Sequence, residues 1–489
     1  MGAPLKILGL ATAGLLVGCA TVPRDAGFAD VRRDVADRAS VAVQWRGQTQ
    51  DDAAADAAVC KLLAKPLGVD DAVQIALLNN LTLQATYGEL GVAQADVVQA
   101  GLLANPVLSI ERRFTAGFGG QAAEIDVGYD FLQLFFIPLR KRIAASTFES
   151  AKSRVGQAVL DTVAEVREAY YTYQADLQTL EMRRTILAAA DAQAEAARKL
   201  RAAGNTMLLD LNNQIAIAQR ARLDVAVAEA EAVQHRERLN VLMGLWGGQT
   251  TWAIPDRLPE LPQGDVPGDW LEAQAVSKRL DLAAARQEIV TTAQNLGLAR
   301  GLRFVPTLDI GGHYEHEIEG SVHSIGPSAN LTLPLFDQGQ AVTARGLAML
   351  QQGRLRYAAL AIQIRSEVRA AAARVAAAHD RAAYMHNAVL PLQAKLLEET
   401  QLQYNGMFMG VFQLLQARRD QIDAGRDYID ALRDYWTARV ELEKALGSRL
   451  AVGPTPVSQP AAESALPAPA MGPMNGMKDM PGMKNMPGM

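Results

Sequence analysis

Two regions of the chain alternate between apolar and polar side chains. The first begins at residue 107, passes through a Gly-rich turn at residues 115–121 and returns to residue 131. In its return strand the apolar positions are Ile125, Val127, Tyr129 and Phe131, and the intervening positions are Glu124, Asp126, Gly128 and Asp130. A period of two predicts a β-hairpin with one apolar and one polar face. Strands of about ten residues have the length that crosses an outer membrane when tilted.

The second alternating region starts at residue 307, and we expect its return strand to reach Leu335. One side of its first strand holds Leu308, Ile310, Gly312 and Tyr314, and the other holds Asp309, Gly311, His313, Glu315 and Glu317. The pattern predicts a second hairpin of the same kind.

Most of the remaining chain is Pro-poor and has helical patterning. We expect helices at about residues 69–104, 140–203, 208–243 and 269–303, then about sixty residues after the second hairpin, and a last helix that ends at Leu446. Sixty residues of helix measure about 90 Å, which an ordinary globular domain does not accommodate. Pro391 should kink the second long helix. Residues 20–68 are weakly patterned and are expected to form an extended arm with little helix.

The two halves of the chain repeat one plan. Leu211 and Gly244 are 33 residues apart, as are Leu414 and Gly447, at an offset of 203. Each pair marks a helix that follows a Gly/Asn turn and stops at glycine, so each half ends in a helical hairpin. The order in each half is helix, strand, strand, long helix, helix. A Pro- and Gly-rich linker at residues 245–268 separates the halves.

Four strands cannot close a barrel, and unpaired strand edges are very costly in hydrocarbon. The sheet must therefore close with other chains. Three protomers would give twelve strands and two would give eight. Long helices that enclose a conduit favour the trimer with its twelve-stranded barrel.

The N-terminus is predicted to be a targeting segment. Lys6 precedes an apolar stretch at residues 7–17, which is too short to span a membrane. The sequence L-V-G-C ending at Cys19 resembles the lipobox of bacterial lipoproteins, and the resemblance implies lipidation of Cys19. A plain cleaved signal peptide is the alternative. The predicted organisation is a signal peptide at 1–18, a lipidated arm at 19–68, repeats at 69–244 and 269–449, and a tail at 450–489.

Composition excludes several functions. The net charge of −5 argues against a nucleic-acid partner, and the two cysteines, Cys19 and Cys60, imply no disulfide framework. No P-loop, nucleophile elbow, dinucleotide fingerprint or metalloprotease helix is present, so neither an enzyme nor a bound cofactor is expected. His379 and His386 share a face of the long helix and are expected to be surface or packing residues.

Several motifs resemble those of the TolC-like outer-membrane efflux proteins. They are A-V-Q-I-A-L-L-N-N at residues 72–80, G-L-L-A-N-P at 101–106, L-T-L-P-L-F at 331–336, G-V-F-Q-L-L-Q-A-R-R at 410–419, D-Y-W at 434–436 and A-L-G at 445–447. The resemblance implies a mainly α-helical fold, in which a trimer forms a twelve-stranded outer-membrane β-barrel and a periplasmic α-barrel. The implied partners are a periplasmic adaptor (membrane fusion protein), an inner-membrane RND-type pump and outer-membrane lipid.

The resemblance also places the hairpin tips, residues 201–210 and 404–413, at the periplasmic end, where the tunnel narrows and the adaptor docks. The candidate gate and docking residues are Arg201, Asn205, Asp210, Tyr404 and Asn405. In a trimer each recurs three times, and a ring of like groups sets an electrostatic gate. Each could equally be a turn former or cap, and Arg418, Arg419 and Asp420 are the fallback gate residues.

Two groups of residues are candidates for metal binding. The first comprises His313, Glu315, His316, Glu317, Glu319 and His323 near the second hairpin turn, where a solvated loop is the alternative and the alternation of faces makes chelation poor. The second is a tail with methionine at every third position: Met471, Met474, Met477, Met480, Met483, Met486 and Met489. Thioethers select Cu(I) or Ag(I) over Zn(II), so transient binding of those ions is expected. Disorder without a partner is the alternative.

Three functions remain open from the sequence. The favoured one is the outer-membrane channel of a tripartite pump that exports heavy-metal cations, with copper or silver as cargo. The second is the same conduit serving drugs or polypeptides, and the third is a structural helical lipoprotein. Membrane-length hairpins at matching places in the two repeats argue against the third.

Overall fold

The computed structural model describes residues 21–23, 25–47, 50–114, 121–262, 264, 270–304, 307–317 and 322–450. The chain divides into two units, Met1–Arg449 and Leu450–Met489, and every described residue except Leu450 belongs to the first. Cys19, Glu319 and the seven tail methionines lie outside the described residues.

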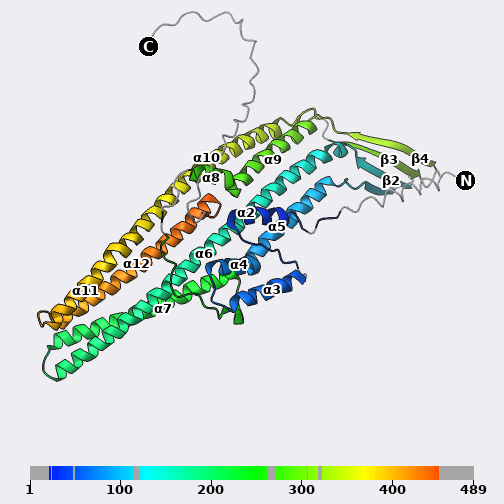
Figure 1. Cartoon of the computed structure of the whole chain (residues 1–489). Helices are drawn as coiled ribbons and strands as arrows, with labels where there is room; N and C mark the ends of the chain where they lie inside the picture. The colour runs from blue at the N-terminus through cyan, green and yellow to red at the C-terminus, as the bar shows by residue number, and fades with distance from the viewer. Residues whose placement is uncertain are drawn as a thin grey trace, which may run out of the picture. The chain divides into compact units, whose positions relative to one another are not determined.

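The fold is mainly helical with four antiparallel strands, which confirms the predicted fold class (Figure 1). Its first half comprises α2 (Phe28–Ala39), α3 (Gln50–Leu63), α4 (Val69–Asn79), α5 (Leu81–Gly101), β1 (Val107–Phe114), β2 (Gln121–Asp130), α6 (Leu132–Ala202) and α7 (Leu208–Met243). After the short 3-10 helix η1 (Gly247–Thr250) come α8 (Leu271–Lys278), α9 (Leu280–Leu302), β3 (Leu308–Glu317), β4 (Val322–Leu331), α10 (Gln340–Tyr384), η2 (Met385–Val389), α11 (Leu390–Asn405) and α12 (Val411–Leu446).

The four strands form one sheet in the order β1-β2-β3-β4, with antiparallel neighbours. The register confirms the predicted faces. One row across the sheet is Ile110, Ile125, Tyr314 and Ile325, and the next row on the opposite face is Glu111, Glu124, Glu315 and Ser324. The expectation that the last strand reaches Leu335 is wrong, because β4 ends at Leu331. Pro334 follows shortly after, and proline has no N–H to continue a ladder.

The first long helix begins earlier than predicted. It starts at Leu132 rather than near Arg140 and keeps Pro138 inside its second turn. Proline there removes one helical hydrogen bond. The Arg140 guanidinium donates to the Gln133 carbonyl at 3.0 Å and to its side-chain oxygen at 3.1 Å, which links the turns on either side of the proline.

The predicted helices at 69–104 and 269–303 are each divided in two, which sequence reasoning missed. The break after α4 falls at Asn80, whose side-chain oxygen accepts from the Leu83 N–H at 3.0 Å and caps α5. The break after α8 falls at Arg279, which is the equivalent position of the second repeat.

Each break contacts the glycine that ends the same repeat. Gly244 and Gly447 are both left-handed at φ 66°, and both follow the last helix of their repeat as predicted. A Cβ on Gly244 would lie 2.4 Å from the Asn79 carbonyl oxygen, and a Cβ on Gly447 would lie 3.3 Å from the Arg279 Cα. The repeat is therefore preserved in its tertiary contacts as well as in its element order.

The second long helix is interrupted before Pro391. A π-helical turn, η2, separates α10 from α11, and the Leu390 N–H donates to the Met385 carbonyl five residues back. Pro391 is the second residue of α11, where the lost N–H matters less. The structure thus shows a π turn just before this proline, and the kink predicted at Pro391 stays a prediction.

The expectation that residues 20–68 form an extended arm with little helix is wrong. They contain α2 and α3, and α2 packs on α6 through Phe28, Val31 and Val35, which are at most 3% exposed. Their spacing of three and four places them on one helical face. The Phe28 ring also meets Tyr87 at 5.0 Å between centroids.

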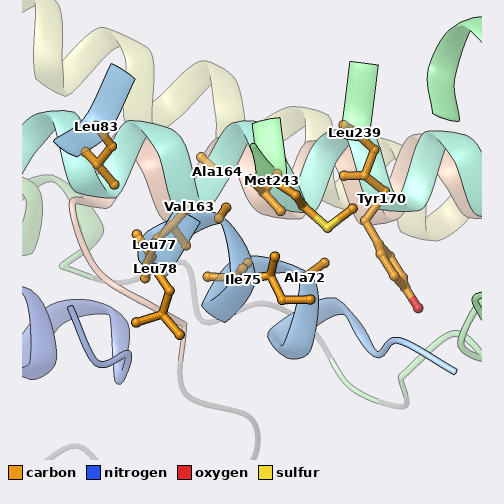
Figure 2. Packing of buried hydrophobic residues seen from close by; sticks show 14 of the residues in the cluster. Ala72, Ile75, Leu77, Leu78, Leu83, Val163, Ala164, Tyr170, Leu239 and Met243 are labelled. Carbon is orange, nitrogen blue, oxygen red and sulfur yellow. The ribbon is translucent and has the colours of Figure 1, made fainter. Parts of the chain in front are cut away.

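The linker between the halves packs into the core. Trp252, Ile254 and Leu258 are buried, and the Leu67 N–H donates to the Ala253 carbonyl at 2.8 Å. Figure 2 shows part of the same cluster, where α4 and α7 meet α6 through labelled residues that include Ile75, Leu77 and Met243. This core holds the first repeat's helices together between the sheet and the hairpin.

Candidate functional site

The first helical hairpin ends in a closed turn. Gly204 is left-handed at φ 79°, and the Asn205 N–H donates to the Leu200 carbonyl at 2.9 Å. The Arg201 guanidinium donates to the Thr206 carbonyl at 3.0 Å. The Thr206 hydroxyl lies 3.3 Å from the Asp210 carboxylate. Arg201, Asn205 and Asp210 thus all take part in the hydrogen bonding of this turn, and their role as a gate stays a prediction.

The second hairpin turn places a methionine where the first has a glycine. Met407 is left-handed at φ 63°, and it stands 203 residues after Gly204. Its N–H donates to the Tyr404 carbonyl at 3.0 Å, and the Asn405 side chain accepts from Gln401 at 3.1 Å. Met407 and Phe408 are 93% and 86% exposed. Tyr404 and Asn405 therefore lie beside an exposed apolar tip, and their role as a gate stays a prediction.

The fallback gate residues lie near a cavity between the two hairpins. Helices α6, α7 and α12 enclose about 160 Å³, and the lining includes Arg418 and Arg419. The buried Oε1 of Gln214 at this cavity has no hydrogen-bond partner within the described chain. Asp420 accepts a hydrogen bond from Gln416 at 2.7 Å. The two arginines are thus placed where the hairpins face each other.

The histidines near the second sheet hairpin do not form one group. His313 lies on the polar face of β3, whereas His316 lies on the other face and stacks on His323 with centroids 4.3 Å apart. The alternation of faces expected from the sequence is confirmed. On the polar face, His313 Nδ1 meets Glu124 and Asp126 of β2, and its Nε2 lies 3.9 Å from Glu315.

Sequence reasoning placed Glu124 and Asp126 on a polar face but did not bring them to His313. The signal was present in the alternation, but the pairing of β2 with β3 joins strands almost 190 residues apart in the chain. Only the register shows that Asp126 stands directly opposite His313 and Glu124 directly opposite Glu315.

The two helical histidines contact aromatic rings. His379 lies 5.8 Å from the Tyr435 ring and His386 lies 5.4 Å from the Tyr428 ring, both measured between centroids. Both contacts join the second long helix to α12, so the expectation of packing residues is confirmed.

A buried ionic contact joins the two halves of the chain. The Arg167 side chain on α6 is 7% exposed and pairs with Glu443 of α12 at 2.8 Å and with Asp70 of α4 at 3.2 Å. Arginine suits such a position because its guanidinium offers five donors in a fixed plane. This contact fixes the second repeat's last helix against the first repeat.

No helix in the described ranges has an apolar stretch long enough to cross a membrane. The sheet is the part of the described chain with membrane-length strands. Its apolar side chains Leu108, Ile110 and Ile325 are 60%, 72% and 86% exposed.

Comparison with known proteins agrees with this geometry. Residues 72–245 match the family model described as "Outer membrane efflux protein". The chain is 25% identical over 330 residues to outer membrane protein OprJ of Pseudomonas aeruginosa, covering 62% of this chain and 68% of OprJ. It is 22% identical over 390 residues to the cobalt-zinc-cadmium resistance protein CzcC of Cupriavidus metallidurans, covering 78% and 91%.

Solved structures share the fold at lower sequence identity. The CmeC outer membrane channel of Campylobacter jejuni superposes with a TM-score of 0.67 at 16% identity, covering 88% of this chain and 93% of CmeC. CusC superposes with a TM-score of 0.64 at 16% identity, covering 78% and 92%. The fold is therefore that of an outer-membrane channel. Residues 72–245 are thus similar to the outer membrane efflux proteins, and the fold is the one that solved outer-membrane channels share.

Proposed function

We propose that this chain is the outer-membrane channel of a tripartite efflux pump and that its cargo is a heavy-metal cation, with copper or silver favoured. Three copies form the channel, and each contributes four strands to one twelve-stranded barrel. A periplasmic adaptor and an inner-membrane RND-type pump complete the assembly. Cys19 carries a lipid anchor in the outer membrane.

The observation that carries the channel function is the open sheet. Within the described residues β1 and β4 each have a single strand partner, so both outer edges of the sheet are unpaired. One face is apolar and exposed, and the other carries charged side chains. Unpaired edges are too costly in lipid, so β4 of one copy must pair with β1 of the next. Closure with the apolar face outward gives a barrel with a polar lumen.

Cross-linking between the two edges tests this closure. We start from a Cys60→Ser background and place cysteines at Ser109 on β1 and Ser328 on β4, both on the polar face. A short bifunctional thiol reagent should give dimer and trimer bands with the double variant. The matched controls are the two single variants, which should not give a trimer band. A monomeric mass in mild detergent, or no intermolecular product, would exclude the shared barrel.

The cargo assignment rests on the methionine tail. Three or four thioethers on a Gly- and Pro-rich backbone complete a Cu(I) site, and methionine avoids the disulfides that cysteine forms in an oxidising compartment. CzcC, a relative of this chain, is named for cobalt-zinc-cadmium resistance. The tail would capture copper near the adaptor or pass it to a chaperone.

A peptide spanning residues 470–489 tests the tail directly. It should bind Cu(I) or Ag(I) and ignore Zn(II), and its Met→Leu counterpart should bind neither. Deletion of residues 471–489 should lower copper tolerance while the trimer stays intact. Equal affinity of the peptide for Cu(I) and Zn(II) would refute the copper assignment but would not affect the proposal that the chain forms a channel.

The alternative cargo is an organic compound. Other relatives carry names such as "Antibiotic efflux pump outer membrane protein ArpC" and "Toluene efflux pump outer membrane protein TtgC", both from Pseudomonas putida at 24% identity. A deletion strain compared for metal and drug sensitivity separates the two. Loss of drug or solvent tolerance with unchanged metal tolerance would favour the organic cargo.

A further inference from the structure

The polar face of the sheet carries an unusual row of like charges. Glu111, Glu124 and Glu315 stand directly opposite one another on β1, β2 and β3. Like charges directly opposite each other destabilise a sheet. The adjacent row places Asp126 opposite His313, so a fourth carboxylate and an imidazole adjoin the row. Arg113 is the cation that pairs with Glu111 and Glu124.

We propose that Glu124, Asp126 and His313 form a binding site for a divalent metal ion of the Zn²⁺ or Co²⁺ type. Each residue offers one ligand atom, and the three atoms lie within 4.8 Å of one another. All three side chains are partly buried, with His313 28% and Glu124 18% exposed. The site depends on two strands of one protomer and on neither the cargo nor the partners proposed above.

The His313–Glu124 separation matches that of tetrahedral ligands, and the His313–Asp126 separation is shorter. The His313 Nδ1 lies 2.8 Å from an Asp126 oxygen and 3.4 Å from Oε1 of Glu124. Metal–ligand bonds of about 2.1 Å put tetrahedral ligands about 3.4 Å apart, so the His313–Asp126 pair must open by about 0.6 Å to admit the ion. Three protein ligands leave a fourth position for water.

Neighbouring side chains orient the ligands. Arg113 contacts Oε2 of Glu124, whereas Oε1 is the oxygen nearest His313. One oxygen is thus held by the guanidinium while the other faces the ion position, which is how outer-shell groups orient metal ligands. Glu315 approaches the other imidazole nitrogen, with its Oε2 3.9 Å from His313 Nε2.

The donor set decides which metals the site takes. One imidazole and two carboxylates suit borderline divalent ions, whereas Cu(I) and Ag(I) prefer soft sulfur donors. The site therefore differs in selectivity from the methionine tail. A channel with both would hold divalent ions on the sheet and monovalent soft ions at the tail.

The experiment measures Co²⁺ and Zn²⁺ binding to the purified full-length protein in detergent. Co²⁺ reports its geometry through visible absorption, and Zn²⁺ should displace it. His313→Gln and Asp126→Asn, which keep the side-chain size nearly unchanged, should each weaken binding by at least about tenfold, because even outer-shell changes cost that much. The matched control is His316→Gln on the opposite face of the same strand, which should bind Co²⁺ like the wild type.

The outcomes separate the alternatives. If His313→Gln and Asp126→Asn bind Co²⁺ as the wild type does, the proposal is wrong. If His316→Gln abolishes binding instead, the metal lies at the stacked His316–His323 pair on the other face, which also overturns it. Gel filtration and circular dichroism confirm that each variant is folded, and either substitution suffices where the other fails to assemble. Cu(I) serves as a negative control: a chain that lacks residues 471–489, and so lacks the methionine tail, should not bind Cu(I) at this site.

Discussion

The contact of Gly244 with the α4–α5 break allows a quantitative test of the repeat architecture. Gly244→Ala combines two penalties, a left-handed backbone at φ 66° and a Cβ that would lie 2.4 Å from the Asn79 carbonyl oxygen. Gly204→Ala is the matched control, because Gly204 is also left-handed at φ 79° but has nothing within 4 Å of its Cβ position. The difference between the two variants isolates the steric clash.

The expected magnitudes come from general costs. A left-handed residue with a Cβ costs about 1–2 kcal/mol, which both variants incur. Overpacking adds about 1–3 kcal/mol to Gly244→Ala alone. Gly447→Ala should fall between them, because its Cβ would lie 3.3 Å from the nearest atoms of Arg279. Met407→Gly should stabilise its turn instead, because glycine adopts the left-handed backbone at φ 63° without the cost that methionine incurs.

Hydrogen exchange measured by mass spectrometry reports these local free energies peptide by peptide. Gly204→Ala should speed exchange near its own turn by about five- to thirtyfold, because 1.4 kcal/mol is a factor of about ten. Gly244→Ala should speed exchange at residues 76–84 and 239–246 by at least a further fivefold or so. Equal effects of Gly244→Ala and Gly204→Ala at their respective sites would refute the packing of Gly244 against Asn79.

Three other predictions concern the halves, the tips and the anchor. Arg167→Ala should cost about 1.5–3 kcal/mol by thermal unfolding, because it removes the 2.8 Å charged hydrogen bond to Glu443, which keeps its 3.9 Å ion pair with Arg439. Arg167→Met with Glu443→Leu should cost less, since neither charge of the 2.8 Å pair remains. Asp210→Ala with Tyr404→Ala should raise single-channel conductance in lipid bilayers, and unchanged conductance would place the gate elsewhere. Cys19→Ser should abolish incorporation of labelled lipid while the trimer survives, and a mature N-terminus at another residue would refute the lipobox interpretation.

The elements with a strong local pattern could be predicted from the sequence. The period of two predicted both hairpins and the faces of β2 and β3, because side chains on a strand alternate regardless of what the strand pairs with, whereas the end of β4 was predicted four residues too late. Gly244 and Gly447 marked the ends of α7 and α12, because left-handed caps favour glycine. Family motifs and the repeat then indicated the channel fold before any contact was known.

Features that depend on long-range contacts were decided by the tertiary structure. The sequence pattern placed Asn80 inside one continuous helix. In the structure its side-chain oxygen caps α5, and its side-chain amide donates to the Leu242 carbonyl at 2.9 Å. Weakly patterned residues 28–39 become a helix because α6 offers an apolar face to Phe28 and Val35.

The group of Glu124, Asp126 and His313 shows the same difference between what the sequence determines and what the tertiary structure decides. The sequence by itself determined that Asp126 and His313 each lie on a polar strand face, because alternation is a local property. It did not determine that they meet, since a shift of one residue in the β2–β3 pairing would send His313 to the other side of the sheet relative to Asp126. That register is set by the packing of whole strands and their flanking helices, which no short stretch of sequence encodes.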